Sequence, residues 1–172
     1  MRPTRRMAMR LGLAVVLVAA AAGGALAQTD VEQDLKDADT YFESDQIDKS
    51  AAAFDRAISK SPSGVPAGAY AKRASIFFIK AGKDPKQVDR GLAWIDGTAL
   101  RTHAGSGVIL EQKALLLDRD PKRKGDAVTL AEEITGKDAS LYFAQSLVGT
   151  YYASACAASA DKVIGAFEAY LK

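Results

Sequence analysis

After residue 28 the chain carries apolar residues at helical spacing along nearly its whole length, in segments separated by short breaks. The first two series are Val31, Leu35, Ala38 and Phe42, then Ile47, Ala51, Phe54 and Ile58. Apolar residues three or four positions apart lie on one face of an α-helix, so each series predicts an amphipathic helix. No segment alternates apolar and polar residues between hairpin turns. The sequence therefore predicts an all-α chain.

Glycine and proline mark the breaks between the predicted helices, because both residue types interrupt a helix. After the break at residues 61–66, the pattern predicts further helices over about 67–81, 86–100, 108–118, 126–135, 139–157 and 161–171. The links are short, and a short link between two helices favours an antiparallel hairpin. We therefore expect eight helices in four hairpins.

The second and third predicted hairpins resemble each other when the chain is shifted by forty residues. At this shift residues 72–77 fall on residues 112–117, and Gly91 falls on Ala131. Small residues at the matching points of two helices allow the helices to approach closely. Repeats in this length range are typical of helical solenoids. The expected fold is an α-solenoid of about four antiparallel helix hairpins.

Six residues early in the chain have a recognisable spacing. They are Ala38, Tyr41, Ser50, Phe54, Ala57 and Pro62, with the small residues Ala38 and Ser50 at two close-packing positions. In this pattern residues 31–62 resemble a tetratricopeptide repeat, although Asp34 and Asp37 stand where that family prefers an aromatic residue and a leucine. The resemblance implies a right-handed superhelix over residues 28–172, formed by one well-matched repeat and three degenerate ones.

Residues 1–27 have the pattern of a secretory signal peptide. Four arginines within the first ten residues are followed by seventeen uncharged residues that end in Ala25-Leu26-Ala27, a small-x-small cleavage site. A retained membrane anchor is the alternative, but it needs about 20 strongly apolar residues, and this run is diluted by alanine and glycine. We expect cleavage after Ala27, a mature chain that does not span a membrane, and a periplasmic location, with secretion as the alternative.

The charge balance changes when this segment is removed. The whole chain has 23 Lys and Arg against 21 Asp and Glu, and the four arginines lost leave a formal charge of −2. A nucleic-acid partner is not expected, because it requires a clustered basic surface. The short basic run Lys122-Arg123-Lys124 is interpreted as a solvated loop rather than a site for an acidic partner.

The counts of cysteine and histidine exclude several kinds of site. Cys156 is the only cysteine, so no disulfide can form within the chain, and one Cys with one His cannot make a four-ligand Cys/His zinc site. Cys156 lies among small residues and is expected to be buried. The aspartates of residues 37–48 lack the glycine and glutamate of a calcium loop. We expect no metal and no cofactor.

No pattern of catalytic residues is present in the sequence. His103 lies in a glycine-containing loop, and Gly105-Ser106-Gly107 is not a nucleophile elbow. There is no phosphate-binding glycine loop, and no two carboxylates are paired in an apolar setting. We therefore expect a non-enzymatic, exported interaction module that binds a peptide or a partner protein. Two alternatives are a structural subunit of an envelope complex and a helical cell-wall hydrolase that acts through carboxylates.

The resemblance also implies where a partner binds, because the first helix of each tetratricopeptide hairpin lines the concave face. Residues one turn to either side of the small residue in each first helix are the expected contacts: Glu32, Asp39, Glu43, Ala71, Ser75, Phe78, Glu111, Asp118 and Arg119. Such a groove is acidic at its N-terminal end and apolar in the middle. It would fit a partner segment with a basic end and an apolar anchor, and Phe78 is the expected contact for that anchor.

Overall fold

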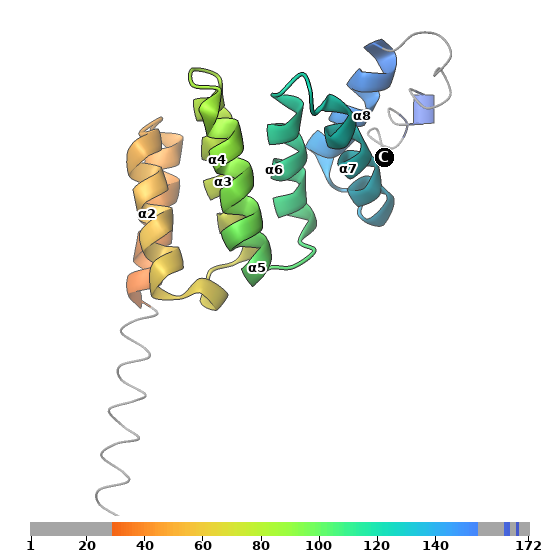
Figure 1. Ribbon diagram of the computed structural model, residues 1–172. Coiled ribbons are helices and arrows are strands. Elements are labelled where there is room, and N and C mark those ends of the chain that lie inside the picture. Colours follow the sequence, from red (N-terminus) through yellow and green to blue (C-terminus); the bar gives the residue numbers. More distant parts are fainter. Residues whose placement is uncertain (1–28, 155–163, 166–167, 169–172) are drawn as a thin grey trace, which may run out of the picture. The chain divides into compact units, whose positions relative to one another are not determined.

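The computed structural model describes residues 29–154, 164–165 and 168, and every regular element in them is helical (Figure 1). The prediction of an all-α chain is confirmed for these residues. They divide into two compact units, with the division in the chain between Pro62 and Ser63, and each unit is described by itself. The predicted signal peptide, Cys156 and most of the helix predicted over 161–171 lie outside the described residues.

The first unit consists of a helix over residues 29–43 and α2 (Ile47–Lys60), joined by a three-residue link. The link turns through Asp45, whose φ is 56°, a left-handed conformation that aspartate tolerates better than most residues. The two small residues at the expected close-packing positions are fully buried, and the Ser50 hydroxyl donates a hydrogen bond of 2.9 Å to the carbonyl oxygen of Ala38. Phe54 is also buried, as predicted, at 1% exposure.

The second unit follows η1 (Pro62–Gly64) and contains the remaining helices. They are α3 (Ala67–Ala81), α4 (Lys86–Trp94), η2 (Ile95–Ala99), α5 (Leu100–Thr102), α6 (Gly107–Asp118), α7 (Lys124–Lys137) and α8 (Tyr142–Ser154). α3 packs on α4 and on α6, α6 packs on α7, and α7 packs on α8. Their buried faces form a shared apolar core that includes Ile76, Ile95, Ile109, Leu116 and Ile134.

A glycine permits a close helix contact in this unit. A Cβ atom at Gly91 would lie 2.7 Å from both Leu116 Cδ1 and Phe77 Cβ, so α4 approaches its neighbours at a distance that no larger residue allows. Ala131, its counterpart at a shift of forty residues, is fully buried on α7. Both small residues thus occupy helix contacts, as the repeat predicted.

Three helix boundaries and one helix type differ from the prediction. Helix α8 begins at Tyr142 rather than at residue 139, because Asp138 accepts hydrogen bonds from the backbone N–H and the hydroxyl of Ser140 and holds a turn there. Helix α7 is longer than predicted at both ends. The helix predicted over 86–100 contains a π-helical segment, η2, which the spacing of apolar residues did not reveal.

Candidate functional site

Two helices of the second unit, α3 and α6, carry or adjoin six of the nine residues that the sequence predicts for partner binding, and α8 lies beside α6. α3 contacts α6, and α6 in turn contacts α8, so these three helices are neighbours (Figure 1). Ala71, Ser75 and Phe78 lie on α3, Glu111 and Asp118 lie on α6, and Arg119 directly follows α6. The predicted residues of this unit therefore come from adjacent elements.

Phe78 and Arg119 are in direct contact. The Arg119 guanidinium lies over the Phe78 ring, 4.0 Å from its centroid, which is within the range of a cation–π interaction. Phe78 is half-buried and Arg119 is exposed. The structure thus joins two predicted residues into one pair, and a partner that reached the Phe78 ring would meet the arginine with it.

The two small predicted residues of α3 offer little surface to a partner. Ala71 is buried, at 9% exposure. Ser75 is half-buried, and its hydroxyl donates a hydrogen bond of 2.7 Å to the carbonyl oxygen of Lys72 in the same helix. Ser75 therefore already has a local hydrogen-bond partner.

Glu111 has a structural contact that its sequence position did not reveal. It is buried, at 7% exposure, and its Oε1 accepts a hydrogen bond of 3.0 Å from the backbone N–H of Ala144. Ala144 lies in the first turn of α8, where backbone N–H groups have no partner within the helix and where a negative charge is favourable. Glu111 thus caps α8 from a neighbouring helix.

Asp118 lines an open pocket of about 340 Å³ between α6, the start of α7 and α8. Its apolar walls come from Leu115, Phe143, Leu147 and Tyr151, and Lys124, Ser146, Thr150 and Ser154 complete the lining. Asp118 is half-buried, and its carboxylate forms no hydrogen bond or ion pair with any residue that the structure describes. The pocket therefore combines apolar walls with two charged side chains, Asp118 and Lys124.

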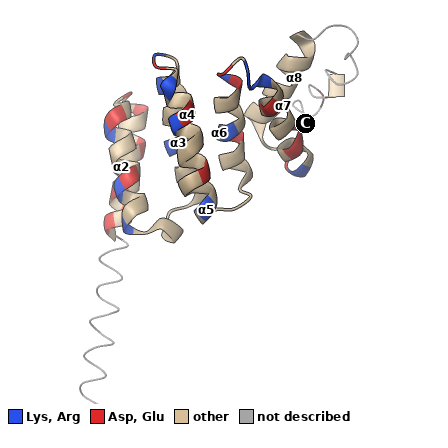
Figure 2. Cartoon of the chain, in the orientation of Figure 1, with Lys and Arg blue, Asp and Glu red and all other residues tan. Residues whose placement is uncertain are grey.

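Sequence reasoning missed the contribution of α8 to this pocket. Phe143, Leu147 and Tyr151 follow each other at intervals of four residues, so they share one face of the helix. Phe143 is 53% exposed and Tyr151 is 37% exposed. A signal was available, since residues 139–160 contain no Asp, Glu, Lys or Arg, and Figure 2 shows α8 free of charged residues.

The other three predicted residues, Glu32, Asp39 and Glu43, lie on the helix over 29–43 in the first unit. Glu32 and Glu43 are exposed, and Asp39 is half-buried. Residues 29–62 carry nine Asp and Glu against four Lys and Arg, and many of these charges are visible on the two helices in Figure 2. The two helices of the first unit therefore carry an excess of negative charge.

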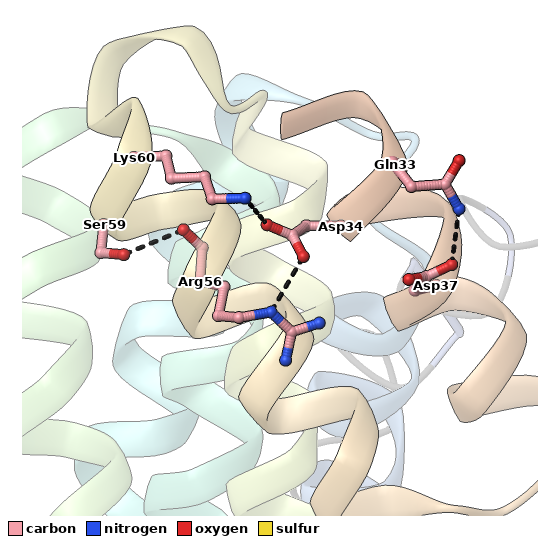
Figure 3. Close-up of polar contacts among 6 residues, drawn as sticks. All are labelled: Gln33, Asp34, Asp37, Arg56, Ser59 and Lys60. Atoms are coloured by element: carbon pink, nitrogen blue, oxygen red, sulfur yellow. Dashed lines mark hydrogen bonds and ion pairs between the residues drawn. The ribbon is translucent and has the colours of Figure 1, made fainter. Parts of the chain in front are cut away.

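Asp34, a departure from the tetratricopeptide pattern, has a clear structural role (Figure 3). Its side chain is buried between two cations of α2: Arg56 Nε donates to Oδ1 at 2.9 Å, and Lys60 Nζ donates to Oδ2 at 2.7 Å. Burial alone would raise the pKa of Asp34, but the hydrogen bonds from Lys60 and Arg56 outweigh it and hold the pKa below its ordinary value. The pairs tie α2 to the helix before it.

Two Asp-Pro-Lys turns meet at a second open pocket, of about 320 Å³. In each turn the aspartate accepts the backbone N–H of the lysine two residues on, at 3.1 Å for Asp84 and at 3.0 Å for Asp120. Arg123 pairs with Asp89 and Asp120 across this pocket. The basic run of residues 122–124 therefore has its central charge neutralised within the chain.

His103 takes part in local packing. Its Nε2 donates a hydrogen bond of 2.9 Å to the carbonyl oxygen of Val65, and its ring meets the edge of the Tyr70 ring, with centroids 4.9 Å apart. The histidine thus fixes the segment before α3 to the loop after α5. Its nearby Gly105 has a φ of 72°, which explains the glycine in that loop.

Among the described residues, no group of three or more His, Cys, Asp or Glu side chains is arranged to hold a metal ion. Within the same residues, no helix combines the length and the apolar character that crossing a membrane requires. Comparison of the chain with models of protein families, with curated proteins and with solved structures finds no match. The resemblance of residues 31–62 to a tetratricopeptide repeat therefore stays a prediction.

Proposed function

We propose that the chain is an exported, non-enzymatic interaction module that holds a peptide or partner protein on a face built from α3, α6 and α8. On this proposal its helices form a tetratricopeptide-like solenoid of antiparallel hairpins, and residues 1–27 direct it to the periplasm. Stacked helical hairpins bury a continuous core and leave an extended surface for binding.

One observation carries the proposal: partly exposed aromatic side chains line neighbouring helices of one unit. Phe78 lies on α3 and is paired with Arg119. Phe143 and Tyr151 lie on α8 and line the pocket. Helix α6 contacts both α3 and α8. Exposed aromatic residues on adjacent elements are typical of binding surfaces, since such side chains contribute much of the free energy of association.

The test is affinity purification of the protein from its native envelope, with mass spectrometry of the proteins that remain bound. Once a partner is identified, its affinity for Phe78→Ala is compared with its affinity for Lys122→Ala, an exposed control in the loop after α6. We expect weaker binding for Phe78→Ala and unchanged binding for Lys122→Ala. The absence of any stoichiometric partner, or equal affinities in two folded variants, contradicts the proposal.

A further inference from the structure

We infer that the pocket between α6 and α8 binds a partner segment in which an apolar or aromatic side chain stands next to a positive charge, with the charge facing Asp118. The inference rests on the proposed function and names the chemistry of the partner at that face. It concerns one pocket, lined wholly by residues of the second unit.

The walls of the pocket determine the apolar part of the ligand. Leu115 and Leu147 form its aliphatic surface, and Phe143 and Tyr151 stand at its edges with 53% and 37% of their surface exposed. No residue of α8 carries a charge. A pocket of about 340 Å³ can enclose one large side chain, and covering these rings removes apolar surface from water.

Asp118 determines the sign of the charge that the ligand carries. Among the described residues it has no hydrogen-bond or ion-pair partner, whereas Asp89, Asp96 and Asp120 each have one. It is half-buried and lines the pocket, so a cation bound in the pocket would lie close to a carboxylate that no described residue of the chain neutralises.

Lys124 is the other charged residue of the pocket, and it does not reverse this assignment. It is exposed, and it stands at the first position of α7, so its long side chain can remain in water. It forms no ion pair with Asp118. Its position provides a matched control, because it lines the same pocket with the opposite charge.

The experiment uses three indole probes of similar size and different charge: tryptamine, 3-(indol-3-yl)propanamide and 3-(indol-3-yl)propanoate. The full-length chain is exported by an expression host with its own N-terminal segment, labelled with ¹⁵N and titrated with each probe by NMR. We expect tryptamine to bind most tightly, and its chemical-shift changes to centre on Leu115, Phe143, Leu147 and Tyr151.

Three substitutions separate the effect of the charge from the effect of the apolar walls. We expect Asp118→Asn to weaken tryptamine binding about fivefold and to leave binding of the neutral amide unaffected, as for a partly exposed ion pair. Lys124→Gln should leave tryptamine binding equal or slightly stronger. Phe143→Ala, at a position that is 53% exposed, should weaken binding of all three probes.

Four results overturn the inference. The first two are equal affinities for the three probes and chemical-shift changes at residues that do not line the pocket. The third is nuclear Overhauser effects in the free protein that place residues 155–172 against Leu147. The fourth is that phosphatidylcholine vesicles, and none of the probes, change the NMR signals of Phe143. None of them removes the proposed function, which fails if no partner protein is recovered from the envelope or if folded Phe78→Ala and Lys122→Ala bind that partner equally. The two failures are therefore distinguishable.

Discussion

The carboxylate of Glu111 on α6 accepts a hydrogen bond of 3.0 Å from the backbone N–H of Ala144, 33 residues later in the first turn of α8. This bond joins two helices of the proposed binding face. It also satisfies a backbone donor that α8 cannot satisfy itself. The position of the α8 aromatic residues therefore depends on an acidic side chain of a different helix.

Replacing Glu111 should loosen α8 more than it affects the rest of the unit. We expect Glu111→Ala to lower the free energy of unfolding by about 1–2 kcal/mol, as for the loss of a helix cap. Glu111→Gln keeps an acceptor oxygen and should cost less. Urea denaturation measures the difference, and hydrogen exchange at the Ala144 amide locates it. Equal losses in the two variants would show that the hydrogen bond is not the cause.

Asp34 should make the first unit sensitive to acid. Its pKa in the folded chain lies below the ordinary value of 3.8: burial opposes ionisation, and the hydrogen bonds from Lys60 and Arg56 outweigh it. The unfolded chain therefore takes up a proton more readily than the folded one as the pH falls. The stabilisation is complete above about pH 4, the unfolded value, and is lost as the pH falls through the folded pKa.

The corresponding measurement compares the wild type with Asp34→Asn by urea denaturation at several pH values. We expect the variant to be less stable by about 1–3 kcal/mol at pH 7, as for lost hydrogen bonds to a charged group, and the difference to shrink below pH 4. Asp45→Asn, at an exposed turn position that asparagine also tolerates, is the control. A difference that stays constant with pH would exclude the ion pairs as its source.

Phe54 should be one of the most costly residues to truncate. It is 1% exposed, and replacement with alanine leaves a cavity in the core, so we expect a loss of about 3–5 kcal/mol. Ser59→Ala on the exposed side of the same helix should change the free energy of unfolding by less than about 0.5 kcal/mol. Thermal and urea denaturation are the measurements, and a near-neutral Phe54→Ala would contradict the assigned packing.

Two glycine-to-alanine substitutions should act in opposite directions. At Gly91 the new Cβ would lie 2.7 Å from Leu116 Cδ1 and from Phe77 Cβ, and we expect overpacking to cost about 1–3 kcal/mol. At Gly136 on α7 a Cβ meets nothing within 4 Å. Alanine there should stabilise the helix by about 0.5–1 kcal/mol, because it has the higher helix propensity. Urea denaturation measures both, and a Gly91→Ala variant that is as stable as the wild type, or more stable, would refute the close contact at Gly91.

Export should remove residues 1–27. Cleavage after Ala27 is predicted from the arginines, the short apolar run and the small-residue site together. Intact-mass measurement of the protein from its native host should therefore give a chain that begins at Gln28. A full-length product found in the cytoplasm would contradict both the signal peptide and the proposed location.

The helices were predictable because their signals are local. Apolar spacing and the breaks at glycine and proline placed α3 at its observed bounds and put Phe54 in the core. The start of α8 was predicted three residues early, since the turn at Asp138 depends on hydrogen bonds that apolar spacing does not encode.

The parts of the site that were not predictable depend on contacts between residues far apart in sequence. In the sequence, Asp34 was interpreted as a mismatch to the repeat pattern, because the residues that bind it, Arg56 and Lys60, lie 22 and 26 residues later. Glu111 was interpreted as a groove residue, because its hydrogen-bond donor, the backbone N–H of Ala144, belongs to another helix and has no signal in the sequence. The pocket at Asp118 needs three helices, and no single one of them carries its pattern.

The π-helical segment η2 determines what the deletion of one residue in this helix would do to the structure. Because a π turn contains an extra residue, the helix from Lys86 to Thr102 is out of phase with an unbroken α-helix after Ile95. Removing Gly97, which has open space around it, would restore the α-helical phase and rotate everything beyond it by about 100°. His103 would then swing away from the Val65 carbonyl. A single-residue deletion in η2 would thus undo a tertiary contact six residues further along the chain.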